Sequence, residues 1–401
     1  MQKKLNILRL KWSTLLAILF GLLSQFIFTL IGELKLSEIL AISCLPFIKF
    51  AITNETINEF TKFVYAVLII LLGFILSSVV NDGEIILLIR ASANLLLSIP
   101  IAIFLYYLFS KNENNIFWIL FFLAISTLVA NQENAFSFAD FDHNSLKTYF
   151  SSLFIFVIVF FMYFFDRNYK KRYTIILLIL TGFGLMFLNI RSLGLITLLS
   201  GLLLIYNKPK IRLSYLITSL FLFLFLYYLY IFLTLKYELS QSTLNAIISG
   251  DISLYNPLHL LEYGRKSTYI SFLIALDNPI FGLGPWSAPT NEYLILMGDS
   301  HNNENHISVH STIMMSWLWG GLLGLIGAIL ILSLIIKSLF DSNNFPEGYR
   351  IVNAFILIMS LWALFFSPHG HLRFSIPLAI SYYLALKFKF TKLNQYNASQ
   401  N

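Results

Sequence analysis

Three of the seven histidines fall within one eleven-residue stretch, HNNENHISVHS, at positions 301–311. His306 and His310 are four residues apart, so a helix would place both imidazoles on one face, and His301 or Glu304 could complete a zinc-binding set. However, the asparagines give this stretch a low helix propensity, and the sequence HExxH, typical of zinc proteases, is absent. We therefore predict no metal ion here, and hydrated loop positions for His301 and His306.

Two arginines, Arg191 and Arg265, lie beside apolar segments in stretches that hold few other basic residues. The guanidinium group is planar and always charged, and it binds the oxygens of a phosphate in pairs. A neutral imidazole such as that of His310 can accept the proton of a hydroxyl group, and nearby arginines would keep it neutral. Alternatively, His310 could donate a hydrogen bond to a phosphate oxygen. These residue types suit group transfer from a phosphate-activated donor. The alternative is that both arginines only contact lipid headgroups or nearby carboxylates.

The composition indicates a membrane protein. Of the 401 residues, 58% are apolar and only 12% are charged, and the mean hydropathy is +0.76. A soluble domain cannot bury that much apolar surface. The single cysteine, Cys44, excludes a disulfide framework and a cysteine-based metal site. Twelve segments are long enough to cross about 30 Å of hydrocarbon, at 12–32, 35–52, 62–80, 85–108, 115–131, 147–165, 173–190, 192–206, 213–235, 311–336, 351–367 and 372–388.

The basic residues indicate how these spans are oriented. Most of the 27 lysines and arginines fall on one side of the membrane if the N-terminus is cytoplasmic, as the positive-inside rule requires. The same orientation sends all seven histidines outward. It also spreads the net charge of +7 over many loops, which argues against a nucleic-acid partner. We therefore predict that both termini are cytoplasmic.

The predicted fold is all-α, with about twelve transmembrane helices and one large outer loop that carries short amphipathic helices. Three regions follow: helices 1 to 9 at 1–237, the large loop at 238–310, and helices 10 to 12 with a cytoplasmic tail at 311–401. Arg90 falls inside the fourth span. Because a charge facing lipid is costly, Arg90 is expected to face a polar interior, either the site or a contact between helices.

Two local patterns predict how the large loop meets the tenth span. Apolar Tyr269, Phe272, Leu273 and Leu276 would share one face of an amphipathic helix that ends at Asn278–Pro279 and a glycine-rich turn. In the tenth span, the glycines spaced by three and four residues predict close approach of a neighbouring helix. These glycines are Gly320, Gly324 and Gly327.

The order of these motifs resembles the O-antigen ligase and O-antigen polymerase superfamily. His310–Ser311, nine residues, then Gly321, two residues and Gly324 resemble its H-[NSQ]-x9-G-x-x-G signature. Gly264–Arg265, a helix and the turn N-P-I-F-G-L-G at 278–284 resemble the outer loop of the family. The segment 189–192, N-I-R-S, is similar to its second arginine turn, although Asn-Ile replaces the more usual serine or threonine, and 142–144 is a weaker likeness.

The resemblance implies a glycosyltransferase of lipopolysaccharide biosynthesis in the bacterial inner membrane, acting on the periplasmic face. The donor would be a glycan on undecaprenyl diphosphate, and the acceptor a sugar hydroxyl of lipid A-core or of a second lipid-linked glycan. Such a donor is already activated, so no metal or cofactor is implied. The expected catalytic residues are His310, Arg265 and Arg191. Expected substrate contacts are Asp299, Glu304, Arg90 and His143.

Two alternatives remain open at this stage. One is a polymerase of O-antigen or capsule, which joins lipid-linked repeats instead of transferring glycan to lipid A-core. The other is a flippase or secondary transporter, for which twelve spans are also usual. A transporter would place polar groups near the midplane of the membrane and would consist of two related halves. Here, the polar residues gather in one outer loop. This distribution favours the enzyme.

Overall fold

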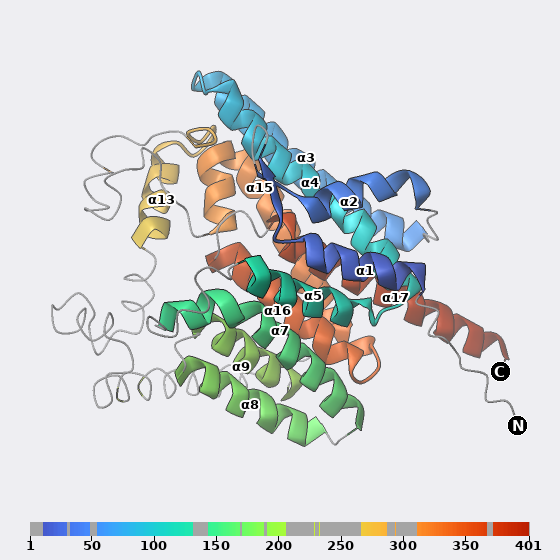
Figure 1. The fold of residues 1–401 in the computed structure, drawn as a ribbon. Helices are drawn as coiled ribbons and strands as arrows, with labels where there is room; N and C mark the ends of the chain where they lie inside the picture. Colours follow the sequence, from blue (N-terminus) through green and yellow to red (C-terminus); the bar gives the residue numbers. More distant parts are fainter. Residues whose placement is uncertain are drawn as a thin grey trace, which may run out of the picture.

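The computed structural model describes residues 11–29, 33–48, 54–130, 143–168, 171–187, 191–205, 266–286, 311–366 and 372–400, with Tyr228, Phe232 and Tyr293 in addition. The described part is an α-helical membrane protein (Figure 1). Its helices are α1 (Trp12–Leu23), α2 (Leu36–Cys44), α3 (Asn54–Val80), α4 (Ile85–Lys111), α5 (Asn115–Ala130), α7 (His143–Asn168), α8 (Lys171–Phe187), α9 (Arg191–Ile205), α13 (Lys266–Asp277), α15 (Thr312–Asp341), α16 (Tyr349–Phe366) and α17 (Ser375–Gln400). Short 3-10 turns, η1 (Leu45–Phe47) and η4 (Ser342–Asn344), and strands β1 (Ile27–Thr29) and β2 (Glu33–Lys35) complete it.

Within the described ranges, five helices are long and apolar enough to cross a membrane. They lie in α3, α4, α7, α15 and α16, and each overlaps most of a span predicted from hydropathy. The helices α1, α5, α8 and α9 are apolar but shorter, and α17 continues beyond its predicted span to Gln400. Apart from Tyr228 and Phe232, the ninth predicted span, 213–235, lies outside the described residues, as does most of the large loop.

The first predicted span differs in the structure. Instead of continuing to residue 32, α1 ends at Leu23, and β1 and β2 form an antiparallel hairpin. The polar pair after the helix explains the early end. Ser24 donates its hydroxyl to the carbonyl of Gly21 at 2.7 Å, and Gln25 donates to Thr127 of α5 at 3.2 Å. The second predicted span is also divided, into α2 and η1.

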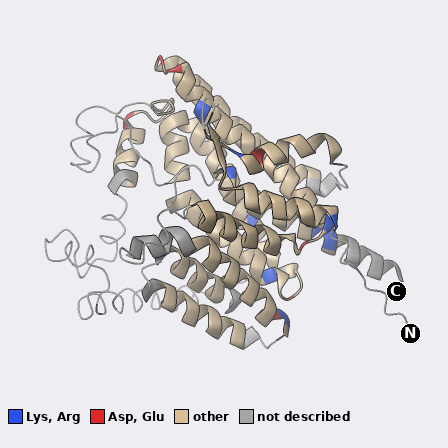
Figure 2. Ribbon diagram, in the orientation of Figure 1, with Lys and Arg blue, Asp and Glu red and all other residues tan. Residues whose placement is uncertain are grey.

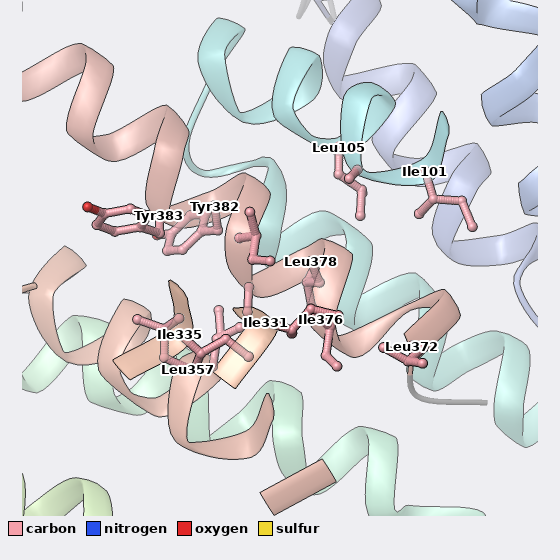
Figure 3. Packing of buried hydrophobic residues seen from close by; sticks show 14 of the residues in the cluster. Ile101, Leu105, Ile331, Ile335, Leu357, Leu372, Ile376, Leu378, Tyr382 and Tyr383 are labelled. Atoms are coloured by element: carbon pink, nitrogen blue, oxygen red, sulfur yellow. The ribbon is translucent and has the colours of Figure 1, made fainter. Parts of the chain in front are cut away.

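The closest helix packing joins α15 to α3. An added Cβ on Gly73 of α3 would lie 2.6 Å from the carbonyl oxygen of Gly320, and one on Gly327 would lie 2.6 Å from that of Ala66. The predicted close approach at the α15 glycines is therefore confirmed. Elsewhere α17 lies against α4, and α8 against α9. Figure 3 shows Tyr382 and Leu378 of α17 packed near Leu105 and Ile331, which are fully buried core residues.

Most ion pairs among the described residues gather at one end of the bundle, here called the charged end. Figure 2 shows long uncharged stretches along the helices. At the charged end, Glu59 accepts from Lys337 at 2.7 Å and Lys387 at 2.9 Å. Arg350 pairs with Asp166 at 3.4 Å, and Glu113 accepts from Lys389. These ion pairs connect the start of α3, the ends of α7 and α15 and the start of α16, which therefore lie at the same end of the bundle.

Candidate functional site

The start of α15 is fixed by the residue that follows His310. Ser311 is the N-cap, and its hydroxyl oxygen accepts a hydrogen bond from the amide of Met314 at 3.2 Å. The same hydroxyl donates to the carbonyl of Leu364 in α16 at 3.2 Å, and Thr312 donates to Ala363 at 3.3 Å. A serine oxygen at this position satisfies one of the free N–H groups of the helix. The cap of α15 is therefore Ser311.

The helix α15 is broken at Gly321, nine residues after its first residue, Thr312. The φ of +58° and ψ of −148° at Gly321 are not helical, and a side chain there would be strained. The break frees backbone groups that the turn after α13 takes up: Leu322 donates its amide to Ile280 at 2.9 Å, and Leu283 donates to Leu318 at 2.7 Å. We call residues 278–284 and 317–322 together the turn-kink lock.

Glycine is required on both sides of the turn-kink lock. An added Cβ on Gly321 would lie 2.0 Å from the carbonyl oxygen of Ile280, and one on Gly282, whose φ is +69°, would lie 2.5 Å from that of Leu318. Real Cβ atoms do not approach so closely. Two sequence motifs separated by about thirty residues are therefore one structural unit, and the predicted tight turn at Gly282 is confirmed.

Two further hydrogen bonds fix the lock to its surroundings. Trp317 donates its indole N–H to the carbonyl of Pro279 at 3.1 Å. Asn81, directly after α3, donates its side-chain amide to the carbonyl of Gly282 at 3.1 Å. The lock therefore joins the end of α13, the kink of α15 and the turn between α3 and α4, at the end of α3 far from Glu59.

The helix predicted before the turn is confirmed as α13, which packs one of its faces against α15. Ile270, Ser271, Ile274 and Ala275 are buried, and α13 packs against α15. Phe272 and Leu276, two of the apolar residues predicted to share one face, are 38% and 49% exposed. Small side chains at Ser271 and Ala275 allow the close approach that the lock imposes, whereas leucine and phenylalanine would hold the helices apart. The side chain of Tyr269 lies outside the described residues.

The predicted site residues are only partly within the described structure. His310, Arg265, Asp299 and Glu304 lie outside it. His143 and Arg191 are described as the first residues of α7 and α9, without their side chains.

Arg90 is the predicted site residue whose side chain is described. It is exposed near the start of α4, at one helical turn from Asn94.

A buried ion pair near Asn94 was not predicted. Arg373, just before α17, donates to both carboxylate oxygens of Glu38 in α2, with Nε 2.8 Å from Oε1. It also donates to the side chain of Asn94 at 2.9 Å. The side chains of Glu38 and Arg373 are 3% and 12% exposed. Glu38 is the only acidic residue of the predicted span 35–52, and Arg373 lies in the predicted span 372–388, which has no acidic residue of its own; these charges inside apolar spans are the sequence signal that could have found this pair.

The contacts of Glu38 and Arg373 indicate that the pair stabilises the packing of the neighbouring helices. Arg373 has bidentate contact with Glu38, and the amide of Lys35 donates to Glu38 at 2.8 Å. The pair therefore fixes α2 and the beginning of α17 against α4.

No protein-family model matches the chain, and no curated protein matches it. Within the described residues, no group of three or more histidine, cysteine or acidic side chains is arranged to hold a metal ion. The functional argument therefore rests on the sequence motifs and on the elements that frame them.

Proposed function

We propose that the chain is a membrane glycosyltransferase that transfers a glycan from undecaprenyl diphosphate to a sugar hydroxyl on the periplasmic face of the bacterial inner membrane. Lipid A-core is the favoured acceptor, as in an O-antigen ligase. The proposal includes twelve spans, cytoplasmic termini and a large periplasmic loop. The charged end of the bundle would face the cytoplasm, in agreement with the positive-inside rule.

The turn-kink lock is the observation that supports this proposal most. It joins the two motifs that resemble the ligase superfamily, through backbone bonds that need Gly282 and Gly321. Both α13 and the first part of α15 run toward the lock, so their N-termini point away from it. Arg265 directly precedes α13, and His310 directly precedes Ser311, the N-cap of α15. A helix N-terminus attracts anions, so each start suits a diphosphate.

The starts of α7 and α9 are consistent with the same site. Asp166 near the end of α7 belongs to the charged end, so His143 begins that helix at the opposite end. Because α8 and α9 pack antiparallel, with Gly182 against Gly194 and Gly201 against Leu178, α9 also begins far from the charged end. Figure 1 draws these helix starts on the same side of the bundle as α13. Arg191 and His143 would therefore face the donor from neighbouring helices.

The proposed reaction uses these residues as follows. Arg191 and Arg265 bind the diphosphate and stabilise the negative charge that grows on the bridging oxygen. His310 takes the proton of the acceptor hydroxyl, which attacks the anomeric carbon with inversion. The bond from that carbon to the phosphate oxygen breaks, and undecaprenyl diphosphate leaves. Asp299, Glu304, Arg90 and His143 would contact the sugars.

Reconstitution in vesicles with a lipid-linked glycan tests the proposal. Glycan transfer should occur to lipid A-core, and should fall at least about a hundredfold in His310→Ala, Arg265→Ala and Arg191→Ala. Arg212 lies between the predicted spans 192–206 and 213–235, on the side that the proposed orientation places in the cytoplasm. Arg212→Ala is therefore the matched control and should retain transfer. Transfer to a second lipid-linked glycan alone would indicate a polymerase. Wild-type transfer in all three variants, or movement of the donor across the membrane without transfer, would refute the mechanism.

A further inference from the structure

A groove runs along the outside of the α3–α15 pair, separate from the proposed transfer site. Its volume is about 490 Å³, and apolar side chains of both helices line it. Leu68 and Leu72 of α3 and Leu330 of α15 are 41%, 48% and 38% exposed. All three lie within the membrane-spanning parts of their helices. The groove is therefore open to the hydrocarbon of the bilayer.

The length of the groove matches one leaflet. Ten residues separate Lys62 from Leu72 on α3, which is about 15 Å at 1.5 Å per residue. The hydrocarbon core is about 30 Å thick, so the groove extends through about half of it. A single lipid chain that enters from the charged end would fill it.

The charged end of the groove carries an unbalanced positive charge. Lys62 lines the groove there and is exposed. The neighbouring lysines, Lys337 and Lys387, are already matched by Glu59 and Asp341. Among the residues that the structure describes, no carboxylate forms an ion pair with Lys62. A lysine on the rim of an apolar groove can extend its ammonium group to the headgroup level while its stem packs on the groove.

We propose that this groove binds one acyl chain of an anionic phospholipid, whose phosphate is held by Lys62. The apolar lining suits an acyl chain, and the ammonium group of Lys62 favours an anionic headgroup. A zwitterionic lipid would gain the same apolar contact without the net electrostatic attraction. The undecaprenyl diphosphate donor would bind at the opposite end of the bundle, so the two lipids do not compete.

Native mass spectrometry of the full chain in detergent tests this proposal with phosphatidylglycerol and phosphatidylcholine of identical acyl chains. The wild type should prefer phosphatidylglycerol, and Lys62→Gln should reduce that preference by about fivefold, as expected for one lysine near an anionic headgroup. Leu68→Trp, which fills the groove, should reduce the binding of both lipids. Lys111→Gln, at the same end on α4 but outside the groove, is the control and should behave as the wild type.

Three outcomes would overturn the proposal. Lys62→Gln could keep the full preference, undecaprenyl phosphate could displace phosphatidylglycerol at equal concentration, or the groove could hold a second copy of the chain. The last would appear as a dimer that Leu68→Trp dissociates without any change in bound lipid. Because the readout is lipid binding, its failure is independent of glycan transfer.

Discussion

At the scale of single residues, Gly321 has the strictest requirement. Its φ of +58° and the contact of 2.0 Å that a Cβ would make with the carbonyl oxygen of Ile280 both exclude a side chain. We expect Gly321→Ala to open the turn-kink lock and to lower the free energy of unfolding by about 1–3 kcal/mol. Thermal unfolding in detergent measures the change.

Gly184 of α8 provides the matched control. An added Cβ there meets nothing within 4 Å, so Gly184→Ala should leave the unfolding temperature unchanged or raise it slightly, because alanine favours helix. If Gly321→Ala unfolds at the same temperature as Gly184→Ala, the lock does not contribute to stability. Glycan transfer by Gly321→Ala should also fall, since the lock frames both motif helices.

The pair of Glu38 and Arg373 gives a second prediction at this scale. Arg373→Leu leaves the carboxylate of Glu38, 3% exposed, without its cation, which costs about 3–5 kcal/mol. The double substitution Glu38→Leu with Arg373→Leu removes both charges and should recover much of that loss. Unfolding measurements on the two single variants and the double variant test this. Additive losses would show that the two residues do not act as a pair.

At the scale of elements, the turn between α4 and α5 is tied to α16 and α17 through Glu113. Burial raises the pKa of Glu113, but hydrogen bonds from Lys389 and Tyr349 outweigh it and hold the pKa below its ordinary value. A lowered pKa stabilises the fold above the unfolded-state pKa, and this stabilisation is lost as the pH falls through the folded-state pKa. The unfolding temperature should therefore fall in acid, and fall less in Glu113→Gln. Equal acid sensitivity in both proteins would contradict this role.

The elements also show what the sequence can and cannot predict. Long apolar runs predicted α3, α4, α15 and α16, because nothing else can satisfy their backbone in lipid. Hydropathy did not predict where α1 ends. Ser24 and Gln25 end the helix through hydrogen bonds to Gly21 and Thr127, and hydropathy carries no information about such partners.

Packing decided the features that remained unpredicted. The buried face of α13 depends on how closely it approaches α15, and the pairing of Glu38 with Arg373 joins residues 335 positions apart. Neither follows from local periodicity. In the site, the glycine-rich turn after Pro279 was predicted because its signal is local, whereas the kink at Gly321 and its contact with that turn depend on packing. The positions of the side chains of His310 and Arg265 remain predictions.

At the scale of the whole molecule, the two ends of the bundle differ in chemistry. The charged end holds the ion pairs of Glu59, Glu113 and Asp166. The opposite end holds the turn-kink lock and the starts of α7, α9 and α15. In the proposed orientation, the end rich in paired lysines and arginines would face the cytoplasm, and the helix starts at the other end would offer free N–H groups to the proposed anionic donor. The proposed function needs this asymmetry.

Cysteine labelling tests the asymmetry directly, because the native chain has one cysteine to remove. In a Cys44→Ala background, Glu84→Cys would mark the turn between α3 and α4, and Glu347→Cys the turn before α16; both positions are exposed. A maleimide that cannot cross the membrane should label Glu84→Cys in intact spheroplasts, and Glu347→Cys only after permeabilisation. The reverse pattern would overturn the proposed orientation. Labelling of both from one side would mean that the two ends do not face opposite sides of the membrane, and the transfer site at the end opposite the charges would lose its physical basis.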